Sequence, residues 1–271
     1  MKMSGRLRNS FIGVGILSLL LLSCFDQPGI SVPRFIPKTP PDSLLERGID
    51  AHPDNAIYLE WEEPATAEEE GILGYYVYRG KLNGDEYSFK RIATVNRNAG
   101  LLYKSNEYID NGANLDTTYY YYLRSYNDFT VSKENSDTVY YRLARKASPH
   151  SPSGDISDQK PHLVFQYPIR VVDRISYLYL RLYYMESGSY QIKYFTKTHR
   201  FDLSQSIFNV YLQNNTYHTT VLLDSLKTDG SGNKYLEKGN YRWRVDAVSG
   251  EPGGGPETEG SESNWMYFTV K

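Results

Sequence analysis

The sequence predicts an all-β protein built from two tandem β-sandwiches, and three observations support that prediction. The 271-residue chain contains 26 Tyr, 10 Phe and 3 Trp, and aromatic residues favour strands. Short runs of alternating apolar and polar residues recur between turn-forming residues, which is the pattern of half-buried strands. About 230 residues follow the N-terminal leader and a proline-rich segment, enough for two sandwiches of about 100 residues each.

The N-terminus has the features of a cleaved signal peptide. Lys2, Arg6 and Arg8 precede an apolar run at residues 11–22. This run is about a dozen residues long, whereas a membrane-spanning helix needs about 20. The sequence Leu-Leu-Ser-Cys at 21–24 resembles the bacterial lipobox. The resemblance implies that residues 1–23 are removed and that acyl chains on Cys24 anchor the protein in a membrane, preferably the outer membrane.

Cysteine content and charge restrict the partners. Cys24 is the only cysteine in the chain, which excludes disulfides and four-cysteine zinc sites. Removal of residues 1–23 takes away three of the 30 basic residues and none of the 32 acidic ones, so the formal net charge becomes −5. Nucleic-acid binding needs a positive surface, and we therefore expect no nucleic-acid partner.

Residues 24–42 are expected to form a stalk between the lipidated cysteine and the first folded module. The segment is rich in proline, which is incompatible with a helix or a central strand and favours extended, semi-rigid chain. Its prolines are Pro28, Pro33, Pro37, Pro40 and Pro41.

The first module is expected at residues 43–146. Ile57, Leu59 and Trp61 alternate with Tyr58 and Glu60, so the first three should face a core and the other two should face solvent.

The order of motifs in this module is similar to that of a fibronectin type III domain, an immunoglobulin-like sandwich. The motifs are I-x-L-x-W-x-x-P at 57–64, G-Y-x-V-Y-R at 74–79, Y-x-D at 108–110 and T-T-Y-x-Y-x-L-x-S at 117–125. The resemblance implies that Trp61 packs in the core and that Tyr119 ties a loop to the backbone. Tyr75 is expected to point inward.

A linker or an opening strand is expected at residues 147–160, and a second immunoglobulin-like or fibronectin-like sandwich is expected at 161–271. Residues 175–185 and 189–196 should pair around a turn at Ser187-Gly188. Residues 239–247 and 263–270 should form a final hairpin that contributes Trp243 and Trp265 to the core, and this hairpin resembles the last one of many bacterial immunoglobulin-like domains. The pattern does not fix the strand order of residues 197–230.

Tyrosines that alternate outward on the strands form the candidate binding surface, because tyrosine offers rigid amphipathic area for protein or sugar contacts. The alternative is that these rings only stabilise the sheet by cross-strand pairing. The residues are Tyr76, Tyr78, Tyr120, Tyr122 and Tyr179.

No motif indicates catalysis or a cofactor. The five histidines, at 52, 150, 162, 199 and 218, lack metal-ligand spacing, and nucleophile-elbow and phosphate-loop motifs are missing from the sequence. We therefore expect a non-catalytic lipoprotein, with no metal or cofactor, that mediates adhesion, protein binding or spacing at the cell envelope. One alternative is a glycan-binding accessory lipoprotein of an outer-membrane uptake system. Another is an enzyme with an atypical site in the second module.

Overall fold

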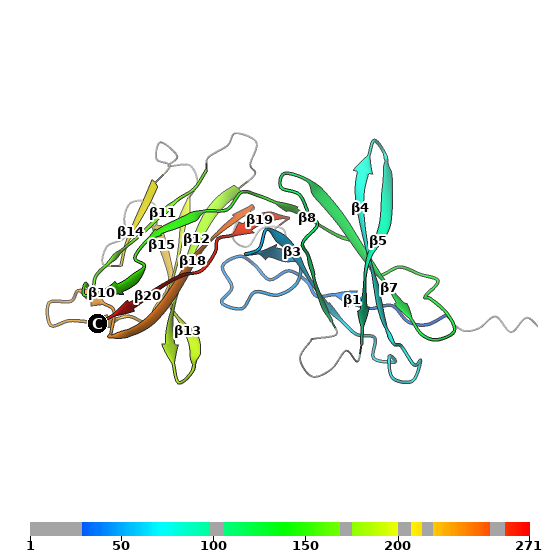
Figure 1. Cartoon of the computed structure of the whole chain (residues 1–271), viewed down its shortest axis with the longest axis horizontal. Coiled ribbons are helices and arrows are strands. Elements are labelled where there is room, and N and C mark those ends of the chain that lie inside the picture. Colours follow the sequence, from blue (N-terminus) through cyan, green and yellow to red (C-terminus); the bar gives the residue numbers. More distant parts are fainter. Residues whose placement is uncertain (1–28, 98–105, 169–174, 200–206, 213–218, 250–257) are drawn as a thin grey trace, which may run out of the picture.

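The computed structural model describes residues 29–97, 106–168, 175–199, 207–212, 219–249 and 258–271. The protein is all-β, and the described residues contain no helix (Figure 1). Cys24 and residues 250–257 lie outside the described residues.

The strands fall into two groups, which we call the first module (β1–β8) and the second module (β9–β20). The strands of the first module are β1 (Arg34–Phe35), β2 (Asp50–His52), β3 (Ala56–Glu62), β4 (Gly74–Asn83), β5 (Glu86–Asn96), β6 (Glu107–Asp110), β7 (Thr118–Tyr126) and β8 (Val139–Leu143). The second module begins with β9 (Ser148–Ser151), β10 (Gly154–Ile156), β11 (His162–Gln166), β12 (Ile175–Glu186), β13 (Ser189–His199) and β14 (Ile207–Tyr211). It continues with β15 (Thr219–Asp224), β16 (Lys227–Thr228), β17 (Lys234–Tyr235), β18 (Gly239–Ser249), β19 (Glu259–Glu262) and β20 (Met266–Val270).

In the first module, a sheet of β1, β2, β3 and β6 faces the sheet of β5, β4, β7 and β8. Trp61 is fully buried between them and meets the ring of Tyr75 edge-on, with centroids 5.7 Å apart. Ile57 and Leu59 are also fully buried, as the alternation predicts. Glu60 was expected to face solvent, but it is buried because Arg47 and the backbone NH of Gly48 donate to its carboxylate.

In the second module, β9, β11 and β14 face the sheet that contains β12, β13, β15, β18 and β20. The predicted hairpin of β12 and β13 is present, and its turn residues Ser187 and Gly188 have positive φ, at 50° and 86°. The predicted pairing of the last hairpin is also present, running from Gly239 opposite Val270 to Trp243 opposite Met266. Trp243 is fully buried in this core.

The sequence did not fix the strand order of residues 197–230. In the structure, the strands of this segment belong to both sheets of the second module. β14 pairs antiparallel with β11, and β15 pairs antiparallel with β13. The intervening residues 200–206 and 213–218 lie outside the described part of the chain.

Residues 147–160 do not form a linker but open the second module, which was the alternative expectation. β9 pairs with β11, and β10 runs parallel to the last strand β20, with Gly154 opposite Phe268. β19 also pairs in parallel with β8 of the first module. The two modules therefore share one continuous sheet rather than being joined by a free segment.

The expectation of a stalk is wrong for the described residues of that segment, because they pack on the first module. β1 pairs with β3, so that Phe35 lies opposite Trp61 and is buried in the first core. Glu70 accepts hydrogen bonds from the backbone and hydroxyl of Ser31. Proline enrichment rules out helix and central strand, but it does not prevent an extended segment from packing on a sheet.

Residues 41–46 continue from this segment onto the second module. The guanidinium of Arg181 on β12 donates to the backbone carbonyls of Pro41 and Ser43. Its Nη2 also lies 3.1 Å from a carboxylate oxygen of Glu46. The end of the expected stalk and the first residues of the expected first module therefore hold the two modules together.

A buried ionic cluster lies at this junction, and we call it the ionic joint. It consists of Glu46, Arg181, Arg244, Asp246 and Glu262. Arg181 Nε lies 2.8 Å from Asp246 Oδ2, and Arg244 Nε lies 2.9 Å from Asp246 Oδ1. Three carboxylates against two guanidiniums leave one unmatched negative charge in a site that is largely closed to water.

The pKa values of the acids reflect burial, opposed by the neighbouring positive charges. Burial works against the charge of Glu46, but Arg244, Arg181 and Lys38 outweigh it and lower its pKa to about 2. Burial raises the pKa of Asp246 to about 6, although Arg244 and Arg181 oppose the shift. Burial also raises the pKa of Glu262 well above its ordinary value. Asp246 is therefore expected to take up a proton on mild acidification, and Glu262 holds its proton more readily than an ordinary glutamate.

Replacing Arg181 with Ala should lower the free energy of unfolding by about 3 to 5 kcal/mol, because it leaves Glu46 and Asp246 short of a buried positive partner. The matched control is Lys193→Ala, which breaks the more exposed pair with Glu186 on the β12–β13 hairpin and should cost at most about 1 kcal/mol. Urea unfolding measures both. Equal costs for the two variants would contradict a structural role for the joint.

The pH dependence of stability should show the raised pKa of Asp246. Because the folded-state pKa of Asp246 is raised, the folded protein binds more protons than the unfolded chain between about pH 6 and 3.8. The contribution of this group to stability therefore grows as pH falls through that window, whereas that of Glu46 is lost as pH falls from 4.5 toward 2. Asp246→Asn removes the surplus charge and should flatten the difference in unfolding free energy between pH 7 and 5. Parallel pH profiles for variant and parent would refute this assignment.

Candidate functional site

The outer face of the β5-β4-β7-β8 sheet carries a field of aromatic side chains, which we call the aromatic face. Four predicted tyrosines lie there, because residues of β4 and β7 alternate between this face and the core. The full set is Tyr76, Tyr78, Tyr87, Phe89, Tyr120, Tyr122, Tyr126 and Tyr140.

Two cross-strand pairs form the centre of the aromatic face. Tyr76 stacks on Tyr126 with ring centroids 4.5 Å apart, and Tyr78 stacks on Tyr122 at 4.6 Å. The guanidinium of Arg91 on β5 lies 4.4 Å from the centroid of the Tyr76 ring. These contacts fix ring orientations, so that a partner would meet side chains whose rotamers are already set.

The end of the aromatic face near the β4–β5 turn is more exposed. Tyr87 meets Tyr120 edge-on at 4.8 Å, and Tyr120 contacts Tyr140 at 5.6 Å. Tyr87 and Tyr140 are 54% and 46% exposed, against half-buried Tyr120. The sequence prediction missed Tyr87, Tyr126 and Tyr140. Tyr126 follows the same alternation as Tyr120 and Tyr122, so the signal for it was present.

Three hydroxyl groups of this face, those of Tyr120, Tyr122 and Tyr126, keep their protons at neutral pH. Burial, followed by neighbouring tyrosines, raises the pKa of Tyr120, Tyr122 and Tyr126 above their ordinary value. Tyr126 donates to the amide oxygen of Asn96 at 2.6 Å. Neutral hydroxyls can both donate and accept hydrogen bonds, which suits a protein or sugar surface.

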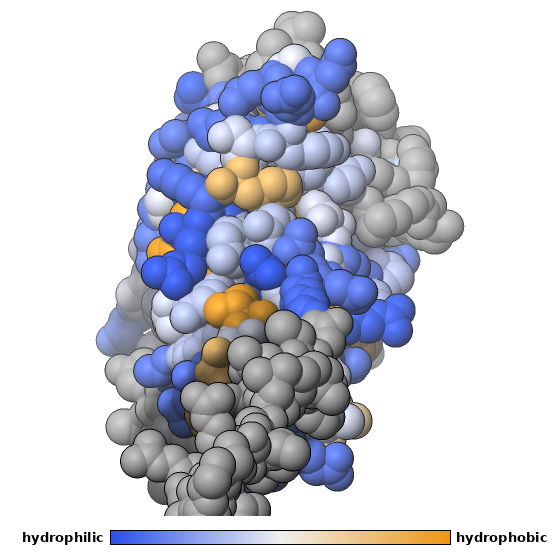
Figure 2. Space-filling model, turned by 90° about the vertical axis from the view of Figure 1, so that its right-hand side faces the viewer, coloured by the Kyte–Doolittle hydropathy of each residue, from blue (hydrophilic) through white to orange (hydrophobic). Residues whose placement is uncertain are grey.

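Figure 2 looks at the side of the first module where β4, β5 and β7 lie in Figure 1. That side is mostly blue and pale, with small separate orange patches. The coloured part of this side is therefore mainly hydrophilic, with separate apolar patches rather than one continuous apolar patch.

Two predicted site residues need correction. Tyr179 was expected to be exposed, but it is fully buried with Tyr177, Phe195 and Val248. Both faces of β12 are covered, so alternation does not separate an outer from an inner side there.

Trp265 was expected in the core, but it is half-buried at the surface. Its ring lies over the guanidiniums of Arg242 and Arg244, at 4.1 and 4.8 Å, and meets Tyr183 edge-on. Trp265 therefore covers one side of the ionic joint. Trp61, Tyr75, Tyr119 and Trp243 are all buried, and Tyr119 accepts a hydrogen bond from the backbone NH of Asn114 in the preceding loop.

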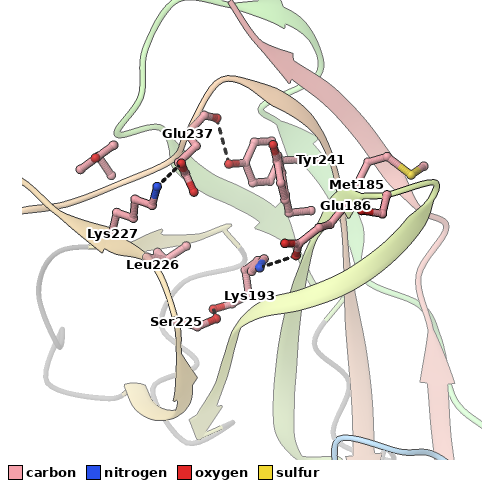
Figure 3. Close-up of a pocket in the computed structure, with 11 residues that line it drawn as sticks. Met185, Glu186, Lys193, Ser225, Leu226, Lys227, Glu237 and Tyr241 are labelled. Carbon is pink, nitrogen blue, oxygen red and sulfur yellow. Dashed lines mark hydrogen bonds and ion pairs between the residues drawn. The ribbon is translucent and has the colours of Figure 1, made fainter.

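The second module has an open pocket of about 530 Å³ at the turn end of the β12–β13 hairpin (Figure 3). Lys193 pairs with Glu186, and Lys227 pairs with Glu237, as the dashed lines in Figure 3 mark. The buried ring of Tyr241 contributes to the lining. Each of these carboxylates already has a lysine partner, so the pocket is polar without an excess of either charge.

Among the described residues, one group of acids could hold a metal ion. It is formed by the three acids of the ionic joint, whose carboxylate oxygens lie within 4.8 Å of one another. Arg181 and Arg244 occupy the space between them. A cation would have to displace a guanidinium, so the cluster is better suited to joining segments than to binding metal.

Two further findings concern the predicted membrane anchor. Among the described residues, no helix is long and apolar enough to cross a membrane. The predicted lipidation site, Cys24, lies outside the described residues.

The chain was also compared with known proteins. No protein-family model matches it, and no curated protein sequence matches it. The function of the protein is therefore inferred from its residues and their geometry.

Proposed function

We propose that this protein is a lipid-anchored, non-catalytic envelope protein whose immunoglobulin-like modules bind a protein partner through the aromatic face. The observation that carries the proposal is the pre-ordered row of stacked tyrosines on the outer sheet of the first module. Tyrosine and arginine dominate binding hot spots, and the aromatic face combines eight aromatic rings with Arg91.

The proposed anchor and the observed joint are compatible with that role. The motif at Cys24 would tether the chain, and the packed segment that begins at Ser31 follows within a few residues. The modules are then presented as one unit close to the membrane rather than on a long spacer.

A glycan-binding role is the second candidate, because the pocket in Figure 3 combines tyrosine rings with both acidic and basic groups. Sugar hydroxyls need donors and acceptors together, and their apolar ring faces stack on aromatic side chains. An enzyme in the second module is less well supported, because Glu186 and Glu237 are both engaged by lysines.

The partner is sought with the mature chain, residues 24–271, immobilised and exposed to envelope extract, with captured proteins identified by mass. The double substitution Tyr78→Ala and Tyr122→Ala should weaken capture of a specific protein about tenfold or more, as expected for hot-spot residues. The matched control is Tyr267→Ala, which removes a 53% exposed tyrosine from the second module. Thermal melting checks that each variant is folded.

The outcomes of this experiment separate the candidates. Retention of the same protein by parent, double variant and control would exclude the aromatic face as the binding surface. Capture of a glycan that depends on Glu186 or Lys193 would favour the pocket and the glycan-binding role instead.

Cys24→Ala should abolish lipidation and leave an unprocessed precursor, because the thiol is the proposed acyl acceptor and is the only cysteine in the chain. Metabolic labelling with a fatty acid and membrane fractionation measure the effect. A variant that is cleaved normally and still sediments with membranes would disprove the anchor. This result would not depend on the outcome of the binding experiment.

A further inference from the structure

The inner face of the β4–β5 hairpin carries basic residues beyond the end of the first core. Tyr75 and Val77 of β4 are buried, and the same side of the strand continues with Arg79, Lys81 and Asn83. Figure 1 shows this hairpin projecting at the top of the first module. The side of the sheet that packs a core lower down is therefore open near the turn.

These residues surround a hollow of about 380 Å³, which we call the basic hollow. Lys90 of β5 lies opposite Arg79, and Ser88 lies opposite Lys81. Asn114 and Tyr119 complete the lining from the loop before β7 and the start of that strand. Side chains from three segments thus converge on one space.

Of the three positive charges that line the basic hollow, those of Lys81 and Lys90 have no ion-pair partner among the described residues. Arg79 is engaged by Asp110, to which its Nη1 donates at 2.8 Å to each carboxylate oxygen. The ammonium of Lys81 lies 5.0 Å from the centroid of the Tyr119 ring. In the described part of the chain, no carboxylate lies within ion-pair distance of Lys81 or Lys90, whereas the pocket in Figure 3 pairs both of its lysines.

The walls are fixed by buried interactions. Asp110 accepts a hydrogen bond from the hydroxyl of buried Tyr121 at 2.8 Å as well as the two from Arg79. The Arg79 guanidinium lies 4.8 Å from the centre of the Tyr119 ring. Arg79 is thereby held at the back of the hollow, while the two lysines at the rim remain available to a ligand.

We propose that the basic hollow binds a phosphate group. Lys81 and Lys90 supply two positive charges, which match a phosphate dianion, and Ser88 and Asn83 add neutral hydrogen-bond donors. Donors approach from several directions, which suits the tetrahedral oxygens of phosphate better than the two coplanar oxygens of a carboxylate. The acidic residues at the turn, Asp85 and Glu86, do not line the hollow.

This site goes beyond the proposed protein-binding function. The aromatic face lies on the outer side of the same hairpin, where Phe89 contacts Tyr122, whereas the lysines lie on the inner side. Either function can fail without the other, because the two sets of residues do not overlap.

The test titrates the mature chain, residues 24–271, with inorganic phosphate at constant ionic strength and follows binding by calorimetry. We expect saturable binding that weakens about tenfold or more in the double variant Lys81→Gln and Lys90→Gln. The matched control is Lys160→Gln with Lys271→Gln, which removes two lysines paired with Asp229 and Asp155 in the second module. The control should bind phosphate as the parent does.

A second arm identifies the source of the phosphate. Phosphatidylcholine vesicles with and without phosphatidic acid are sedimented with the same proteins. Retention that requires phosphatidic acid and is lost in the Lys81/Lys90 variant assigns the hollow to a lipid headgroup, whereas phosphate binding without vesicle retention assigns it to a soluble ligand. Absence of saturable phosphate binding by the folded parent, or equal binding by both double variants, would overturn the proposal.

Discussion

The structure depends on the buried ionic joint at which Glu46 meets Arg181 and Arg244. Burying these groups costs desolvation free energy, which is recovered only when all partners are in place. The joint therefore favours the single arrangement in which residues 41–46 lie against β12 and β18. That arrangement accompanies the parallel pairing of β19 with β8, where Arg142 also reaches Glu259. Backbone pairing and charge pairing thus specify the same contact between the modules.

A fixed junction determines what the free surfaces can do. The second module adjoins β8, so the opposite end of the shared sheet, at β5, is left as an edge among the described strands. The basic hollow lies at this end, whereas the aromatic face extends across the other side of the same sheet from β5 to β8. A partner bound there would meet a surface whose position relative to the second module is set. Such pre-organisation reduces the ordering cost of binding.

Local alternation predicted much of the fold from the sequence. The positions of Trp61, Tyr75 and Trp243 in the cores follow from the period-two patterns of their strands. The same rule failed at Tyr179, because β12 is covered on both sides. The alternation rule could not predict the ionic joint, because Glu46 and Arg181 are distant in sequence and neither lies in a motif. The proline-rich segment was misassigned because composition restricts backbone conformation without revealing what the segment packs against.

The geometry of the candidate sites also could not be predicted from local sequence patterns alone. Tyr78 and Tyr122 could be placed on one face from sequence, whereas their stacking required the register of β4 against β7. The basic hollow also needed knowledge of where the core ends, because Lys81 occupies the inward side of β4 just as buried Val77 does. An inward-facing lysine would normally count against a strand assignment. Here it marks the point at which the facing sheet stops covering β4, and a polar side chain becomes favourable there because the hollow is open to solvent.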